Sequence, residues 1–163
     1  MRNACPVRVK NGSRRRLRIL FLCVNNSCRS QMAEGWARHL KADEMEAFSA
    51  GTEPTRVHPR AVQVMREVGV DISNQRSKHV SEFAHQQFDL VVTLCDGARE
   101  GCPVFRGGTR TLHKSFENPA SAMGSDDEVL RAFRRVRDQI RDFILNLAPP
   151  RAPDKTQQQP FPL

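Results

Sequence analysis

Hydrophobic positions occur along this chain in two alternating patterns. Segments 17–23 and 88–94 contain continuous apolar runs, at 19–22 and at 90–92, which are typical of strands buried on both faces of a parallel sheet. The segment 45–50, which ends at Gly51, predicts another strand, and 109–116 predicts a weaker fourth one. The segments between these runs have the spacing of amphipathic helices.

The first two predicted helices follow the first two strands. After residue 23, one apolar stripe recurs at helical spacing and comprises Met32, Ala33, Trp36, Ala37 and Leu40. Segment 59–68 predicts a second helix, with Pro59 in its first turn and Gly69 just past its end. A short helix is expected from about Lys78, with Ser77 as its N-cap.

The last predicted helix has the clearest pattern. Ser125 and Glu128 form a capping box, and the apolar positions that follow step by four and three: Val129, Phe133, Val136, Ile140, Phe143 and Leu147. Strands that alternate with helices predict an α/β fold, here a single three-layer domain with a four-stranded parallel sheet flanked by helices. Because parallel strands end at the same edge of a sheet, Cys23 and Cys95 should lie on one rim.

Length and charge divide the chain into a domain and two tails. The 163 residues, 39% of them hydrophobic, suffice for one core, which we place at 17–147. Residues 1–34 carry +7 of the net charge of +8, so the basic pI does not predict a nucleic-acid-binding face. We expect 1–16 to be a basic, disordered leader and 148–163, with five prolines, a Pro/Gln-rich flexible tail.

The sequence also predicts a compartment. Its apolar runs are too short to cross a membrane. The run after Arg18 leads to Asn25 and Asn26 rather than to a cleavage site, so we expect no secretory signal. Five cysteines in such a chain favour a reducing compartment. We therefore expect a cytoplasmic monomer without membrane or nucleic-acid partners.

A C-x5-R motif lies between the first strand and the first helix. Backbone N–H groups at a helix N-terminus favour an anion, and the fork of Arg29 can hold two oxygens of a tetrahedral oxyanion. The same positive field favours the thiolate, which makes Cys23 the candidate nucleophile, and Ser30 can donate a hydrogen bond to it. The predicted oxyanion-binding residues are Val24, Asn25, Asn26, Ser27, Cys28, Arg29 and Ser30.

The segment C-V-N-N-S-C-R-S-Q-M-A-E-G-W-A closely resembles the opening of the thioredoxin-coupled arsenate reductases, which share their fold with low-molecular-weight protein tyrosine phosphatases. The resemblance spans 17–147 and includes neither tail. Further matching segments are S-A-G at 49–51, H-P-R-A-V at 58–62, D-I-S at 71–73, D-L-V-V-T-L-C at 89–95, C-P at 102–103 and R-V-R-D-Q-I at 135–140.

This resemblance implies a three-cysteine relay that serves arsenic detoxification. Cys23 would attack arsenate, Cys95 would attack Cys23 and release arsenite, and Cys102 would then move the disulfide outward for thioredoxin to reduce. The glycines at 97 and 101 allow the backbone change that joining Cys95 to Cys102 requires. No tightly bound cofactor is implied. A zinc site built from these cysteines is disfavoured, because Cys23 and Cys28 are separated by an oxyanion loop and the histidines form no paired motif.

The chain departs from the family near its fourth strand. Phosphatases, and commonly the reductases, have an Asp-Pro pair there, but this chain has Asn118-Pro119, and an amide is no general acid. Either Glu117 is the proton donor, or the proton comes from solvent or from arsenate itself. The chain has no Tyr, so an aromatic wall for phosphotyrosine is unsupported. A phosphomonoester hydrolase of the low-molecular-weight phosphatase type is therefore the alternative function.

Two further positions differ from relatives. Some reductases bind a monovalent cation near the counterparts of Asn26, Glu34 and Ser49, with an aspartate where this chain has Lys78, so the Lys78 ammonium is expected to replace the ion. Asn25 stands where relatives often have glycine, and Asn tolerates positive φ. A non-enzyme alternative is an oxyanion-binding or redox-sensing module whose basic leader docks on an acidic partner.

Overall fold

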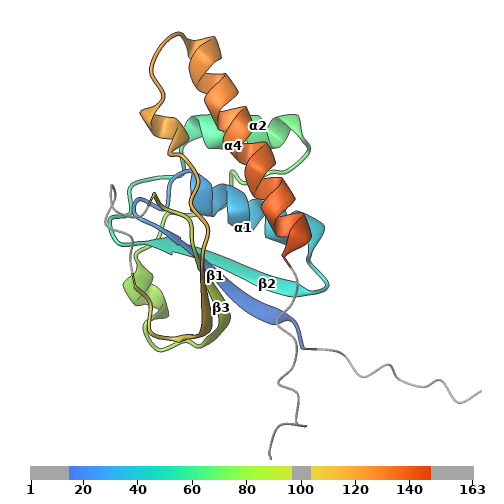
Figure 1. Cartoon of the computed structure of the whole chain (residues 1–163), viewed down its shortest axis with the longest axis vertical. Coiled ribbons are helices and arrows are strands. Elements are labelled where there is room, and N and C mark those ends of the chain that lie inside the picture. Colours follow the sequence, from blue (N-terminus) through green and yellow to red (C-terminus); the bar gives the residue numbers. More distant parts are fainter. Residues whose placement is uncertain (1–14, 97–103, 148–163) are drawn as a thin grey trace, which may run out of the picture.

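A computed structural model describes residues 15–96 and 104–147 of the chain. Predictions that concern Cys102, the glycines at 97 and 101, most of the leader and the tail lie outside these residues. Four strands form one sheet in the order β2-β1-β3-β4, and all neighbouring strands are parallel, as predicted (Figure 1). The strands are β1 (Leu17–Cys23), β2 (Met45–Gly51), β3 (Phe88–Thr93) and β4 (Gly108–His113).

Three helices, α1 (Arg29–Leu40), α2 (Pro59–Glu67) and α4 (Asp126–Asn146), lie on one side of the sheet (Figure 1). The α4 N-cap is Ser125, whose hydroxyl accepts from the Glu128 N–H at 3.2 Å, as the capping pattern predicted. Two 3₁₀ helices complete the described elements, η1 (Val80–Phe83) and η2 (Pro119–Ser121). No helix of the described ranges is both long and apolar enough to cross a membrane.

Two local predictions were wrong in detail. The short helix expected from Lys78 is η1, and its N-cap is His79, whose ring nitrogen accepts from the Ser81 N–H at 3.0 Å. Ser77 instead donates its hydroxyl hydrogen to the carbonyl oxygen of Asn25, 52 residues away in sequence. The fourth strand begins and ends earlier than 109–116. The first difference arises because a distant carbonyl uses the hydroxyl that the local pattern assigns to a cap.

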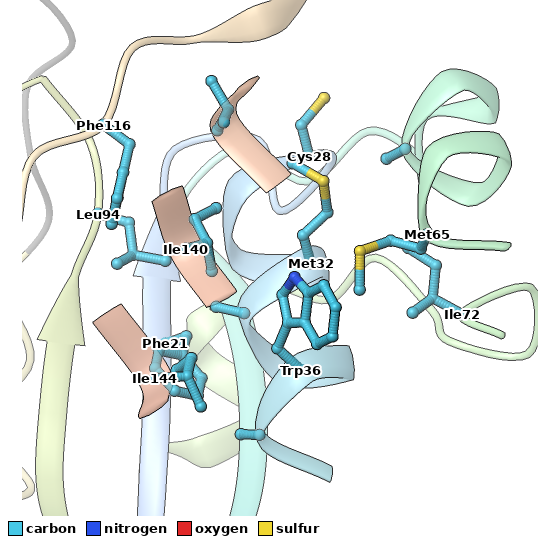
Figure 2. Packing of buried hydrophobic residues seen from close by; sticks show 14 of the residues in the cluster. Phe21, Cys28, Met32, Trp36, Met65, Ile72, Leu94, Phe116, Ile140 and Ile144 are labelled. Carbon is cyan, nitrogen blue, oxygen red and sulfur yellow. The ribbon is translucent and has the colours of Figure 1, made fainter. Parts of the chain in front are cut away.

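The core consists of two apolar clusters, one on each face of the sheet. On the helical side, Phe21 of β1 packs in one cluster with Met32 and Trp36 of α1 and Ile140 of α4 (Figure 2). On the opposite face the cluster comprises Leu20, Leu22, Ala50, Phe83, Phe88 and Val91. Strand β1 is thus buried on both faces, which explains its unbroken apolar run.

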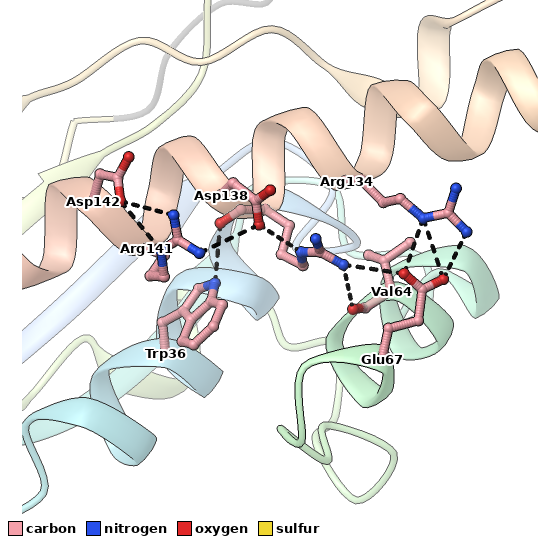
Figure 3. Close-up of polar contacts among 8 residues, drawn as sticks. Trp36, Val64, Glu67, Arg134, Asp138, Arg141 and Asp142 are labelled. Atoms are coloured by element: carbon pink, nitrogen blue, oxygen red, sulfur yellow. Dashed lines mark hydrogen bonds and ion pairs between the residues drawn. The ribbon is translucent and has the colours of Figure 1, made fainter.

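Arg137 joins the three helices. Its side chain is 9% exposed, and Nη1 donates to the carbonyl oxygen of Val64 at 2.9 Å and to Glu67 at 3.1 Å, both on α2 (Figure 3). Its backbone carbonyl accepts from the indole N–H of Trp36 on α1 at 3.0 Å. Arg137 of α4 therefore contacts α2 through its buried guanidinium and α1 through its backbone carbonyl.

Replacing Arg137 with methionine should lower the free energy of unfolding by about 3 kcal/mol, because the buried Val64 carbonyl oxygen loses its guanidinium donor and the Glu67 carboxylate keeps only Arg134. Urea denaturation measures this loss. Arg134→Met is the matched control, since the Arg134 side chain is 41% exposed where it pairs with the same Glu67. It should cost less than about 1 kcal/mol. Equal losses in the two variants would contradict the special role of Arg137.

Candidate active site

The predicted oxyanion loop connects β1 to α1. Cys23 is the last residue of β1 and is buried, and its sulfur lies 2.9 Å from the hydroxyl oxygen of Ser30 in the first turn of α1. A cavity of about 40 Å³ opens at the sulfur and is lined by Cys23, Asn25, Ser27, Cys28, Arg29, Asn118 and Ala120. Val24 lines the adjoining larger cleft. The structure thus brings the candidate nucleophile, the arginine and much of the loop together.

The loop turns at Asn26 rather than at Asn25. Asn26 has φ of 46° and is the one non-glycine residue with positive φ in the described ranges, so the expectation for Asn25 was wrong. The buried side-chain oxygen of Asn26 accepts from the Lys78 N–H at 2.9 Å. Asn25 is exposed, and its carbonyl oxygen accepts from Thr55 and Ser77. Asn26 is therefore the residue that distant contacts hold in this conformation.

Gly51, at the end of β2, allows the loop to pass close by. A Cβ atom there would lie 2.3 Å from the carbonyl oxygen of Val24 and 2.9 Å from the backbone nitrogen of Asn26. Any side chain would displace the loop. The matching S-A-G segment was the only sequence signal for this role, and it did not reveal the contact.

Arg29 connects the loop to the segment after β4. Its guanidinium is buried, and Nη1 donates to the carbonyl oxygen of Phe116 at 3.2 Å. This hydrogen bond holds the start of the segment with Asn118 and Ala120 against the cavity. A guanidinium fixed in this way can present its other N–H groups to a tetrahedral oxyanion.

The proton-donor candidate Glu117 points to α4. Its carboxylate accepts from the guanidinium of Arg135 at 2.8 Å, and it lines the larger cleft of about 580 Å³ together with Glu53 and Asp96. Asn118 lines both the small cavity and the larger cleft, and its side-chain oxygen accepts from the Ala120 N–H at 3.1 Å. The sequence did not show that Arg135 holds Glu117, because the two residues lie on different elements.

Cys95 lies at the same sheet edge as Cys23. Leu22 pairs with Thr93 in the parallel register of β1 and β3, and the Leu94 N–H donates to the carbonyl oxygen of Leu22 at 2.9 Å. Cys95 follows directly and is fully buried. It is disulfide-bonded, whereas Cys23 and Cys28 are free, so neither of these two is its partner. The predicted third thiol, Cys102, lies outside the described residues.

Cys28 is a second thiol close to the nucleophile. It is buried, and this burial, helped by the nearby Cys23, raises the pKa of its thiol to about 12. A group with a raised pKa keeps its proton at neutral pH. Cys28 is therefore an uncharged thiol beside the anion site.

Alkylation should distinguish the two thiols. Iodoacetamide at pH 8 should modify Cys23, the candidate nucleophile, and leave Cys28 unmodified. Only the thiolate reacts, and the Cys28 thiol, with a pKa of about 12, is protonated at this pH. Peptide mapping by mass spectrometry on fully reduced protein measures both sites. Unfolded protein serves as the control, in which both cysteines should react. Equal labelling of the two in folded protein would refute the prediction.

Behind the loop, Glu34 of α1 is almost fully buried. Burial raises the pKa of this carboxyl group, while the charges of Lys78 and Arg38 oppose the rise. Arg38 donates to Oε1 at 3.2 Å, and Lys78 acts from further away, since its ammonium donates to the carbonyl oxygen of Arg76. Glu34 Oε2 and the Ser49 hydroxyl are buried without a hydrogen-bond partner among the described residues. These two oxygens suit a cation, but the nearby Lys78 ammonium disfavours one.

Elsewhere in the described ranges, no group of three or more His, Cys, Asp or Glu side chains gathers as metal ligands do. The reactive and charged groups at the small cavity belong to Cys23, Cys28 and Arg29. A buried strand that ends in a cysteine, an oxyanion loop and a helix N-terminus define a class, the cysteine-dependent phosphatase-type proteins.

Comparison with known proteins specifies the class further. The family model for low molecular weight phosphotyrosine protein phosphatase matches residues 18–158. The arsenate reductase of Halalkalibacterium halodurans is 48% identical over 130 residues, which are 80% of this chain and 94% of that protein. The chain belongs to this phosphatase family and, within it, to the arsenate reductases.

Two solved structures support this assignment. An arsenate reductase in the phosphate-binding state is 36% identical, with a TM-score of 0.64 over 80% of this chain and 95% of that chain. The thioredoxin-dependent arsenate reductase of Corynebacterium glutamicum is 26% identical, with a TM-score of 0.56 over 78% of this chain and 60% of that chain. The likeness therefore covers the predicted sheet and its helices.

Proposed function

We propose that this protein reduces arsenate to arsenite in the cytoplasm as a monomer, with 17–147 as the catalytic domain. The observation that carries the proposal is the placement of Cys95 one strand away from Cys23 at the same sheet edge, beside a loop built for a tetrahedral oxyanion. A hydrolase needs the first thiol only. A second cysteine at this edge is what a reduction requires.

In the proposed reaction, the thiolate of Cys23 attacks arsenic(V) and displaces one oxygen as water. The thiolate of Cys95 then attacks the sulfur of Cys23, and the electron pair of the sulfur–arsenic bond passes to arsenic, which leaves as arsenite. The resulting Cys23–Cys95 disulfide is attacked by Cys102, and Cys23 leaves as a thiolate. A thioredoxin dithiol then reduces the Cys95–Cys102 disulfide. Each turnover transfers two electrons from thioredoxin to arsenate.

Two observations support this order. Cys95 is disulfide-bonded while Cys23 is free. This arrangement is expected after thiol–disulfide exchange has released Cys23 from its disulfide with Cys95. The Corynebacterium glutamicum relative is thioredoxin-dependent, which favours the same reductant here. Because Glu117 is engaged by Arg135, its use as a proton donor would require that ion pair to open. Solvent or arsenate is the simpler proton source.

The test is arsenate-dependent oxidation of NADPH in the presence of thioredoxin and thioredoxin reductase. Turnover is expected with arsenate and not with phosphate, because phosphorus(V) accepts no electrons under these conditions. Mass mapping of the oxidised product should find Cys95 joined to Cys102. The absence of turnover with fully reduced thiols would refute the proposed function.

Lys78 is proposed to replace a monovalent cation beside Glu34. The thermal stability of the wild-type protein should then be equal in potassium chloride and in choline chloride at constant ionic strength. Lys78→Met should lose about 1–2 kcal/mol, because the buried Glu34 carboxylate loses a compensating charge. Potassium should restore part of that loss. Lys41→Met, which removes a surface pair with Glu44, is the control. Potassium-dependent stability of the wild-type protein would contradict the replacement.

A further inference from the structure

Asn118 brings a polar side chain to the small cavity from outside the oxyanion loop. Five of the seven residues that line this cavity belong to the segment from Cys23 to Arg29, and the other two are Asn118 and Ala120. Ala120 has no polar group in its side chain. Among the described residues, Asn118 is therefore the one polar side chain that the rest of the fold adds to the groups of the loop.

The backbone determines which end of the Asn118 amide is available. The Ala120 N–H lies 3.1 Å from the side-chain oxygen of Asn118 and can only donate, so the atom that faces it must be the acceptor Oδ1. This contact is the N-cap of η2. The amide nitrogen Nδ2 therefore lies at the other end of the side chain, and its two N–H groups make no hydrogen bond within the described residues.

Contacts on both sides hold the backbone of Asn118 beside the cavity. Two residues earlier, the Phe116 N–H donates to the carbonyl oxygen of Leu94 at 3.2 Å. The Phe116 carbonyl oxygen accepts from the buried guanidinium of Arg29, also at 3.2 Å. On the other side, the Ser121 N–H donates to the carbonyl oxygen of Asn118 at 3.1 Å. Because these contacts fix the backbone, binding through the Asn118 side chain costs little conformational entropy.

We propose that Asn118 is an oxyanion-binding residue, whose Nδ2 donates a hydrogen bond to a tetrahedral oxyanion in the small cavity while Oδ1 caps η2. The proposal deepens the proposed function and rests on it, since it takes the small cavity to be the arsenate site. An amide keeps its protons, so it stabilises an anion without acting as an acid. The residue that cannot be a general acid thus has a role in substrate binding.

A carboxylate at this position would have the opposite effect on an anion. It could still accept from the Ala120 N–H, but its second oxygen would bring a like charge close to the bound oxyanion. The adjoining larger cleft already contains the carboxylates of Glu53, Asp96 and Glu117. The neutral amide of Asn118 avoids a fourth negative charge beside the anion.

The test is calorimetric titration of the full, reduced chain with inorganic phosphate at neutral pH. Asn118→Ser keeps an oxygen that can cap η2 but removes the amide donor, so the dissociation constant of phosphate should rise about tenfold. Asn118→Asp also adds a charge and should raise it by on the order of 10²-fold. Ser121→Ala is the matched control, because Ser121 belongs to η2 but lines only the larger cleft. Its phosphate affinity should equal that of the wild type.

A second measurement distinguishes a direct hydrogen bond from loosening of the segment. In proton–nitrogen correlation spectra of the wild-type protein, the side-chain amide of Asn118 is assigned through its bonds to the Asn118 backbone, so no variant is needed. Saturating phosphate should move one of its two proton signals downfield, because a hydrogen bond to a charged oxygen deshields the donated proton. The side-chain amide of Asn146, at the end of α4, should not shift.

Three results would each overturn the proposal. They are an unchanged phosphate affinity in folded Asn118→Ser, an equal loss of affinity in Ser121→Ala, and Asn118 amide signals that stay in place at saturating phosphate. Urea denaturation checks that the variants are folded, and the wild-type spectra decide if they are not. Neither measurement needs arsenate or thioredoxin. A lack of arsenate turnover with phosphate binding and the amide shift intact would therefore count against the proposed function and not against the role of Asn118.

Discussion

Replacing Cys23 with serine is expected to lower arsenate reduction by on the order of 10⁴-fold or more. A serine hydroxyl at this position has no general base beside it. Its neighbour Ser30 is another hydroxyl, and the guanidinium group of Arg29 contains no acceptor atom. Serine also cannot form the disulfide that carries electrons out of the site. Both the attack on arsenic and the later sulfur exchange are therefore lost together.

The substitution should leave oxyanion binding largely intact, because the loop N–H groups and Arg29 are retained. Coupled NADPH oxidation measures the lost turnover, and calorimetric titration with phosphate measures the retained binding. Cys28→Ser is the matched control from the same loop. It should keep most of the activity, because burial leaves the Cys28 thiol protonated and outside the relay. Substantial activity in Cys23→Ser would exclude Cys23 as the nucleophile.

Replacing Cys95 with serine should lower thioredoxin-coupled turnover by on the order of 10³-fold or more, with phosphate affinity unchanged. Without a second thiol at this edge, no thiolate attacks the sulfur of Cys23, and the electron pair of the sulfur–arsenic bond cannot pass to arsenic. The reaction should stop at the adduct on Cys23, which hydrolyses back to arsenate. The same coupled assay, with rapid chemical quench for arsenite, measures both outcomes.

This variant also separates the two candidate functions. If the chain is a phosphomonoester hydrolase, cleavage of an aryl phosphate should persist in the Cys95→Ser, Cys102→Ser double variant. If it is a reductase, aryl phosphate cleavage should be low in the wild type as well, because Asn118 cannot protonate a leaving alkoxide and Glu117 is held by Arg135. Undiminished arsenate reduction in Cys95→Ser would refute the relay.

Strand β1 and helices α1 and α4 were predictable because their signals are local. A strand buried on both faces has a continuous apolar run, and a capped amphipathic helix has a stripe and an N-cap within a few residues. The motif around Cys23 could be predicted for the same reason. The helix N-terminus, the arginine and the loop are neighbours in sequence as well as in space.

The errors concern places where long-range contacts override a local preference. Asn25 and Asn26 are chemically identical, so the sequence could not tell which one takes positive φ. The choice depends on the Lys78 N–H, which reaches Asn26 from 52 residues away. In the same way, Ser77 resembles an N-cap residue, but its hydroxyl donates to the carbonyl oxygen of Asn25 instead.

The sequence by itself therefore determined the order of the elements, the position of the loop between β1 and α1, and the shared sheet edge at which Cys23 and Cys95 lie. The tertiary structure alone decided which partners the polar side chains have. Arg29 reaches Phe116 across 87 residues, and Gln31 reaches Arg76 across 45. The physical reason is that hydrophobic periodicity depends on neighbours within one element, whereas the direction of a buried hydrogen bond depends on backbone groups that only the folded sheet and loops bring together.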